Sequence, residues 1–203
     1  MSNMRVSIFI ILFLINLPAY AAEQGPIGNP WKLDQSPSRD ISIGFYRAKK
    51  NELNQIWLTS EKANLKKHFL LYEFERDADV IFSNDEKWLA INDRLGSNVS
   101  EVRLFNKKSD LEYVEVKQAN VTGKTWAFFF KNNNLKIDSE LSHSYIECIR
   151  WSGDSNSILV VLKGHTDKDH YLDDWVCVYN TKNLSPTLDF KIFNQNSVHF
   201  KKP

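Results

Sequence analysis

The stretch GHTDKDHYLDDW, residues 164–175, places two histidines and four aspartates within twelve residues. Imidazole and carboxylate groups bind metal ions and transfer protons, so this stretch is the first candidate for chemistry. A calcium loop normally has a glycine in mid-loop and a bidentate glutamate after it, and both are missing here. A zinc site would need a third ligand beside the two histidines, which a separation of five residues in a loop does not fix. The six candidate side chains are His165, Asp167, Asp169, His170, Asp173 and Asp174.

For this stretch the sequence predicts no metal site and no cofactor. We expect a solvated loop tip, with a weak cation site and a partner-contact loop as the two alternatives. In either case a calcium or zinc site tighter than ~10 μM is not expected. Because loops carry function more often than the elements they connect, the six side chains remain a predicted partner-binding surface.

Other stretches do not complete a catalytic motif. The sequence contains neither a glycine-rich phosphate loop nor a histidine-glutamate metalloprotease run. Ser152 in RWSGDS lacks the G-x-S-x-G spacing of a serine-nucleophile turn. Ser152 and Asp154 are expected to be turn residues whose short side chains bind backbone amides. His143 has no evident chemical partner and is expected to cap or to lie at the surface. The chain is therefore predicted not to be an enzyme.

The stretch VTGKTWAFFFKNNNL, residues 121–135, differs from its surroundings. Its apolar spacing fits either a strand or a short helix, and we favour a short helix with Thr122 as a possible N-cap. Phe128, Phe129 and Phe130 are consecutive, so they cannot all face one side of either element. At least one must face outward or meet another element, which makes the three phenylalanines a second predicted partner-binding surface.

The first residues have the pattern of a secretory signal peptide. Arg5 precedes an apolar run over residues 6–17, and Ala19 and Ala21 occupy the positions required for cleavage before Ala22. A transmembrane anchor would need about 20 apolar residues, so we expect residues 1–21 to be removed. The product is then periplasmic or secreted. Residues 22–40 are expected to be an extended lead-in, and residues 41–203 a single β domain.

Cleavage would leave 25 basic and 25 acidic side chains, because Arg5 is the only charged residue removed from 26 and 25. A balanced surface argues against binding to nucleic acid and to an anionic membrane surface. Membrane insertion is not expected either, because no segment after residue 21 is apolar enough to span a membrane. The expected partner is a protein.

Short alternating runs rich in Val, Ile, Phe, Tyr and Trp follow the lead-in, each closed by turn residues. This pattern is typical of half-buried strands in an antiparallel all-β protein. The runs are DISIGFY, NQIWLTS, KHFLLYEF, DADVIFS, KWLAIND, SEVRLFN and LEYVEVK.

The chain also contains an internal repeat. Residues 79–93 match residues 148–162 at an offset of 69, and residues 102–108 match 176–182 at an offset of 74. Each copy predicts a strand, a Ser-x-Asp turn, a strand, a loop, a strand ending in aromatic-Asn, and a fourth strand. The repeats thus span about 75–118 and 145–190, and the second carries five extra residues in GHTDKDHYLDDW, which we expect to be a lengthened hairpin loop.

These motifs resemble the blades of β-propellers of the WD-repeat-like and Tol-type kind, here in a small exported bacterial protein. The resemblance implies four-stranded antiparallel meanders, with residues 41–74 supplying a degenerate third blade. Closed propellers have four or more blades, so we expect an open body of two to three blades with one short helix. There are two alternatives. One is an oligomer that completes a ring, and the other is a blade-like sandwich.

The two cysteines, Cys148 and Cys177, are expected in the first and third strands of one meander. Such strands lie about 9.6 Å apart, whereas a disulfide needs Cα atoms within about 7 Å. We therefore expect two buried reduced thiols, although an oxidising compartment and an even cysteine count favour pairing.

Three functions are compatible with these patterns. The first is a binding module that sequesters or inhibits a protein partner, as an immunity protein or inhibitor does. The second is an assembly subunit that pairs through open sheet edges. The third is a metal-dependent enzyme that uses the Asp/His stretch.

Overall fold

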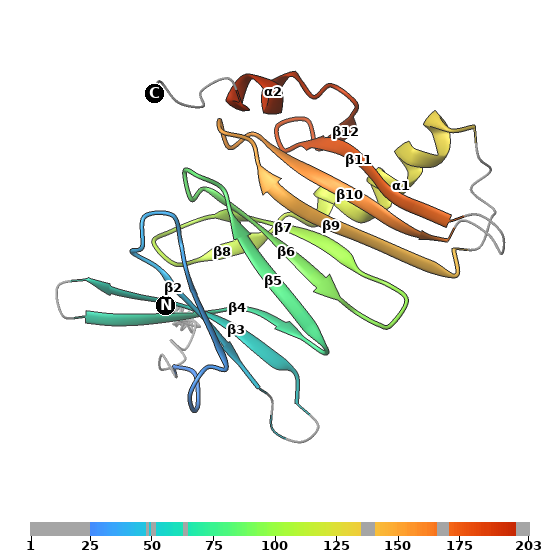
Figure 1. Ribbon diagram of the computed structural model, residues 1–203. Coiled ribbons are helices and arrows are strands. Elements are labelled where there is room, and N and C mark those ends of the chain that lie inside the picture. Colours follow the sequence, from blue (N-terminus) through green and yellow to red (C-terminus); the bar gives the residue numbers. More distant parts are fainter. Residues whose placement is uncertain are drawn as a thin grey trace, which may run out of the picture.

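The computed structural model describes residues 25–47, 49, 52–62, 65–134, 141–165 and 171–197. Its strands form three four-stranded antiparallel sheets, in each of which the strands follow chain order (Figure 1). The protein is thus all-β, and its sheets are meanders, as the repeat predicts. We call the sheets blades 1, 2 and 3. Blade 1 contains β1 (Lys32–Gln35), β2 (Ser42–Tyr46), β3 (Asn54–Lys62) and β4 (Leu65–Phe74).

Blades 2 and 3 coincide with the two copies of the sequence repeat. Blade 2 contains β5 (Asp77–Phe82), β6 (Trp88–Arg94), β7 (Glu101–Lys107) and β8 (Tyr113–Glu115). Blade 3 contains β9 (His143–Trp151), β10 (Ser157–His165), β11 (Tyr171–Asn180) and β12 (Ser185–Thr187). The blades lie side by side in chain order as an open fan, with blade 2 in the middle (Figure 1). The additional blade predicted for residues 41–74 is blade 1. It also includes β1, which lies in the segment expected to be an extended lead-in.

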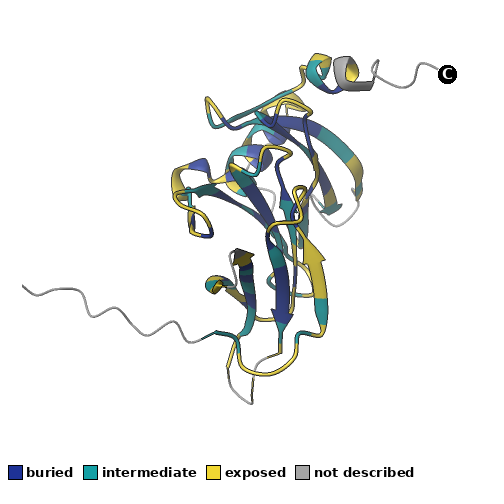
Figure 2. Cartoon of the chain, turned by 90° about the vertical axis from the view of Figure 1, so that its left-hand side faces the viewer, coloured by how far each residue is buried: buried dark blue, intermediate teal, exposed yellow. Residues whose placement is uncertain are grey.

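The middle position of blade 2 explains its burial pattern. Leu89, Ala90 and Ile91 are consecutive in β6 and all fully buried. Leu89 and Ile91 pack against blade 1, whereas Ala90 belongs to the core shared with blade 3. A sheet covered on both faces needs apolar residues at successive positions, not at alternate ones. Figure 2 shows buried residues, in dark blue, on strands of all three blades.

The predicted Ser-x-Asp turns join the first two strands of blades 2 and 3. In blade 2 the hydroxyl of Ser83 accepts the N–H of Trp88 at 3.0 Å and donates to Asp85 at 2.8 Å. In blade 3 the hydroxyl of Ser152 accepts the N–H of Ser157 at 3.0 Å and donates to Asp154 at 2.6 Å. These residues therefore have the predicted turn role.

Blade 1 has the same turn, which the sequence comparison missed. Ser36 pairs through its backbone with Ile41, and its hydroxyl accepts the N–H of Ile41 at 3.3 Å. Ser38 stands where the other turns have aspartate, so the motif is not recognisable by its letters. All three turns have a left-handed residue at the fourth position, namely Arg39, Glu86 and Ser155.

Neighbouring turns are joined by equivalent hydrogen bonds. The N–H of Ser38 donates to Glu86 at 2.7 Å, and the N–H of Asp85 donates to the hydroxyl of Ser155 at 3.2 Å. Each bond runs from the third position of one turn to the side chain at the fourth position of the next. The repeat thus sets both the fold of a blade and the way in which blades meet.

The predicted helix is α1 (Val121–Asn132), preceded by the 3₁₀ turn η1 (Lys117–Ala119). Its N-cap is Asn120, whose side chain accepts the N–H of Gly123 at 3.2 Å, so the expected cap at Thr122 is wrong. The hydroxyl of Thr122 instead accepts the N–H of Val102 in β7 at 3.0 Å. A second helix, α2 (Lys191–Ser197), follows blade 3 and was not expected. Within the residues described, no helix is long and apolar enough to cross a membrane.

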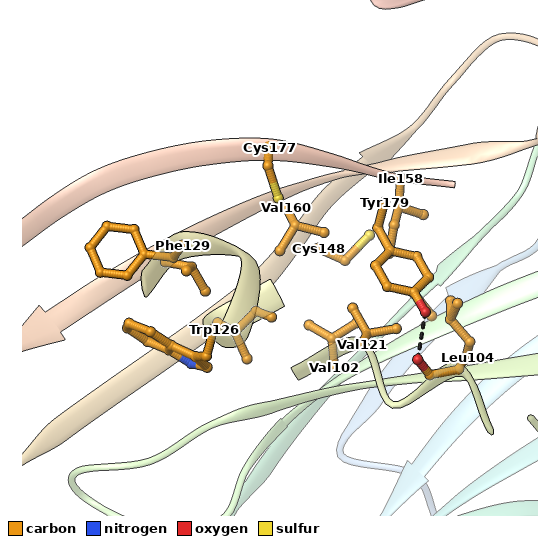
Figure 3. Packing of buried hydrophobic residues seen from close by; sticks show 14 of the residues in the cluster. Val102, Leu104, Val121, Trp126, Phe129, Cys148, Ile158, Val160, Cys177 and Tyr179 are labelled. Atoms are coloured by element: carbon orange, nitrogen blue, oxygen red, sulfur yellow. Dashed lines mark hydrogen bonds between the residues drawn. The ribbon is translucent and has the colours of Figure 1, made fainter. Parts of the chain in front are cut away.

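Cys148 and Cys177 occupy the predicted strands. Both are register partners of Val160 in β10, so one strand lies between them. The thiols are fully buried and unpaired, as expected. Burial raises the pKa of both thiols, which disfavours the reactive thiolate. Both belong to the core cluster that also contains Tyr179 and Trp126, and Figure 3 shows Cys148 near Tyr179 and Cys177 near Val160.

Candidate functional site

The Asp/His stretch is less of a loop than the sequence predicted. β10 continues to His165 and β11 begins at Tyr171, so residues expected in a lengthened loop are strand residues that extend the hairpin. Asp167, Asp169 and His170 lie outside the described residues. Among the residues the structure describes, no three His, Cys, Asp or Glu side chains come together as metal ligands.

His165 meets aromatic rings on both sides. Its ring centre is 4.8 Å from that of His143 in β9 and 4.2 Å from that of Tyr171. His143 and Tyr171 are the register partners of His165 in the two neighbouring strands. His143 therefore has a partner, which its surroundings in the sequence did not reveal.

Asp173 and Asp174 lie where the pairing of β10 and β11 is irregular. Both are exposed, and Asp174 has a left-handed backbone with φ 52°. Asp174 pairs with Lys163 of β10 at 3.1 Å. The hydrogen bond and the negative charge of Asp174 raise the pKa of Lys163. At the irregular pairing, the predicted carboxylate of Asp174 thus forms an ion pair with Lys163 of the neighbouring strand.

Lys163 also lines a groove of about 290 Å³ between blades 2 and 3. We call it the β5–β9 groove, after the first strands of the two blades. Its wall in blade 2 comes from β5, β6 and Ser100, and its wall in blade 3 from β9 and β10. The lining residues are Asp77, Ala78, Asp79, Asn92, Asp93, Arg94, Ser100, Tyr145, Ile146, Glu147, Val161 and Lys163.

Side chains of both charges surround the groove. Asp79 pairs with Lys32 from blade 1, and Lys163 pairs with Asp174. The side chains of Asp77 and Glu147, by contrast, make no hydrogen bond and no ion pair with any described residue, and both residues are exposed. The charge of Glu147 nevertheless acts on Lys163. Two carboxylates are thus available to a ligand from opposite walls.

The backbone edge of β9 is already occupied beside the groove. The amide of Asn92 donates to the carbonyl of Cys148 at 3.0 Å and accepts its N–H at 2.8 Å. The hydroxyl of Ser100 makes the same pair of bonds to Ile146, at 2.9 and 2.8 Å. Side chains of blade 2 therefore occupy the backbone hydrogen-bonding groups of β9 that a neighbouring strand would use. A ligand would contact this wall through side chains.

A second polar cluster holds blades 1 and 2 together. Asp93 of β6 is 1% exposed and accepts a hydrogen bond from the hydroxyl of Tyr72 in β4 at 2.5 Å. Burial and Asp93 raise the pKa of Tyr72. Arg103 lies 3.7 Å from Asp93 and pairs with Glu101 at 2.7 Å and Glu115 at 3.1 Å. Although Asp93 lines the groove, its carboxylate contacts Tyr72 of blade 1 and Arg103 of blade 2 and so joins the two blades.

Phe129 and Phe130 belong to the core and Phe128 packs against it, so little of the predicted phenylalanine surface is open to a partner. Phe129 and Phe130 are each 4% exposed, and Phe128 is half-buried. Phe128 and Phe129 lie against Trp175 of β11, with ring centres 6.1 and 5.1 Å apart. The other element that they meet is blade 3 of the same chain, because α1 fills the space between two blades.

Sequence reasoning missed Asp77, Arg94 and Glu147 as candidates. Each is a charged residue at an exposed position of a strand, where the simplest interpretation is a solvated face. Only the approach of β5 and β9, which are 60 or more residues apart, brings them to one groove.

No protein-family model matches the chain, and no curated protein matches it. Several solved structures are similar in fold, and three of them follow. The chain is 14% identical to TolB from Acinetobacter baumannii, with a TM-score of 0.43, covering 76% of this chain and 30% of that one. An acylaminoacyl peptidase from Pyrococcus horikoshii gives 14% identity and a TM-score of 0.39, with 72% and 22% covered.

The third is the β-propeller domain of the Trilobed protease from Pyrococcus furiosus, described as having an open velcro topology. It is 13% identical, with a TM-score of 0.38, covering 79% of this chain and 43% of that domain. The chain spans less than half the length of each of these proteins. These similarities concern the fold alone, and the propeller-like arrangement rests on the three meanders themselves.

Proposed function

We propose that this chain is an exported binding module that sequesters or inhibits a protein partner, with the β5–β9 groove as its contact site. The observation that carries the proposal is the groove itself, whose two walls carry the exposed carboxylates of Asp77 and Glu147, which form no ion pair with a described residue. Grooves in proteins recurrently bind an extended or helical segment of a partner. Export is proposed from the cleavage pattern of residues 1–21.

Charge indicates the chemistry of the partner. The carboxylates of Asp77 and Glu147 have no ion pair among the described residues, whereas Lys163 is paired with Asp174 and also feels the charge of Glu147. An extended segment of the partner that carries Lys or Arg would therefore be favoured. Because the edge of β9 is capped by Asn92 and Ser100, this segment would gain its specificity from charge pairs at the walls.

Affinity capture from an envelope extract tests the proposal. The wild-type chain should retain a protein that is identified by its mass, and Asp77→Ala with Glu147→Ala should lose it. Asp110→Ala with Glu112→Ala is the matched control, because it removes two exposed carboxylates from the β7–β8 turn. A protein retained equally by all three forms would contradict a groove-based interaction.

A second candidate is an assembly role through open sheet edges. It is favoured by β1, which is an edge strand of blade 1 and carries Leu33 at 69% exposure. An unpaired edge strand can pair with a strand of another chain. Light scattering distinguishes the two, since self-assembly requires a solution mass that rises with protein concentration.

A further inference from the structure

Two histidines outside the groove lie side by side at the end of the β9–β10 hairpin. His143 begins β9, His165 ends β10, and the two are directly opposite each other in the sheet. Directly opposite residues point their side chains to the same face. The two ring centres are 4.8 Å apart, with 39° between the ring planes.

One metal ion would hold two imidazoles at this spacing. A divalent transition metal binds an imidazole nitrogen at about 2.0–2.1 Å, so each ring centre is about 3.2 Å from the metal. Two such rings have centres about 4.5 Å apart at a right angle and about 5.2 Å apart at a tetrahedral angle. The observed 4.8 Å lies between these values.

The imidazole of His143 also has an unsatisfied nitrogen. Its Nδ1 is buried and makes no hydrogen bond with any of the described residues. Buried polar atoms in proteins nearly always have a partner, so each exception requires an explanation. A metal ion shared with His165 would supply that partner.

The backbone fixes the two rings in place. Gly164, just before His165, has φ 136°, and a Cβ there would lie 2.1 Å from the carbonyl oxygen of His143. Only glycine lets the strands approach this closely. Tyr171 packs against His165, and Tyr145 lies 6.2 Å from His143 between ring centres. The pair is therefore held by aromatic neighbours before any metal binds.

We propose that His143 and His165 together bind a divalent transition metal ion, with water completing the coordination. Imidazole suits Cu²⁺, Ni²⁺ and Zn²⁺, and the order of affinity places Cu²⁺ first. Calcium is not expected to bind, since it requires oxygen ligands. With two ligands from the described residues, the site is weaker than a structural zinc site with four.

Isothermal titration of the untagged protein with CuCl₂ and then NiCl₂ tests this site. One ion should bind per chain, Cu²⁺ more tightly than Ni²⁺, and the electron paramagnetic resonance spectrum of the copper form should show nitrogen ligands. His143→Phe and His165→Phe keep an aromatic ring in the stack but remove its nitrogens. Each should weaken Cu²⁺ binding by about tenfold or more.

His68→Gln is the matched control, because His68 lies in blade 1 and bonds to Thr59. It should bind Cu²⁺ like the wild type. Circular dichroism verifies the fold of each variant, and His143→Gln replaces His143→Phe if the phenylalanine is not accommodated. The proposal is overturned by wild-type protein without saturable Cu²⁺ binding. The proposal is also overturned if Cu²⁺ binding survives both phenylalanine substitutions. Cu²⁺ binding that depends on His170 and on neither of the two paired histidines would be such a result.

Discussion

At the scale of single residues, one buried serine organises each turn between the first two strands of a blade. Ser36, Ser83 and Ser152 are at most 2% exposed, and each hydroxyl accepts a hydrogen bond from an N–H at, or one residue before, the start of the second strand. A buried hydroxyl must have partners, so the serine fixes the turn and the register of the strands. In blades 2 and 3 the aspartate two positions later accepts a hydrogen bond from this hydroxyl.

These aspartates make stability depend on pH. Burial opposes ionisation of Asp85, but hydrogen bonds from Ser83 and Lys87 outweigh it and lower its pKa. Burial likewise opposes ionisation of Asp154, and hydrogen bonds from Asn156 and Ser152 lower its pKa. A carboxyl whose pKa is lower in the folded state stabilises the fold at neutral pH, and this contribution is lost as pH falls through the folded-state pKa.

We expect Asp85→Asn with Asp154→Asn to lower the Tm at pH 7 and to flatten its fall between about pH 5 and pH 3. Thermal melts followed by circular dichroism over this range measure both effects. Asp110→Asn with Glu112→Gln, on the exposed turn of blade 2, should melt like the wild type. An unchanged slope in the first variant would show that these turns do not contribute to the acid sensitivity.

At the scale of elements, α1 is a wedge between blades 2 and 3. Trp126, Phe129 and Phe130 are buried at helical spacing, with Trp126 and Phe129 in edge contact at 5.8 Å between ring centres. They join the core of blade 3 that surrounds Cys148 and Cys177. The helix thus supplies apolar volume that a four-stranded sheet alone does not.

Phe129→Ala should lower the free energy of unfolding by about 3–5 kcal/mol, because it leaves a cavity between α1 and Trp175. Phe128→Ala, next in the chain but half-buried, should cost no more than about 1–2 kcal/mol. Urea unfolding followed by tryptophan fluorescence gives both values. Equal losses would mean that α1 does not present a distinct buried face.

The blades, the helix and the unpaired cysteines could be predicted because local patterns determine them. Alternation marks strands, and Ser-x-Asp marks a turn wherever both letters are present. β1 was missed because an edge strand with three exposed residues has no alternation. The helix start was placed wrongly because Asn120 caps from a left-handed conformation, with φ 40°, which the sequence does not reveal.

The sites were harder to predict than the elements. Gly164 and His165 were expected in a loop, but both belong to β10 and pair with β9, which brings His143 beside His165. His143 and His165 are 22 residues apart, so spacing in the sequence cannot pair them. The β5–β9 groove depends likewise on contacts between blades, which an alternating pattern does not encode.

At the scale of the whole molecule, an open fan leaves two outer blade faces without a neighbouring blade. Segments of the chain contact both faces. Gly25 lies against the ring of His68 on blade 1, since a Cβ at Gly25 would be 2.8 Å from it. On blade 3 the ring of Phe193 in α2 is 5% exposed and lies 5.5 Å from the guanidinium of Arg150. Figure 1 shows α2 beside blade 3.

We therefore expect α2 to pack on blade 3 without contributing to the packing of the blades against one another. Phe193→Ala should release it, since Phe193 is the buried residue by which the described part of α2 docks. Amide hydrogen exchange should then rise in residues 191–197 while the strands of all three blades keep their protection. The Tm should fall less than in Phe129→Ala, whose cavity lies between a helix and a sheet.

Lys191→Ala, at an exposed position of the same helix, should exchange like the wild type. Faster exchange throughout blades 1 to 3 in Phe193→Ala would instead show that α2 stabilises the fan as a whole.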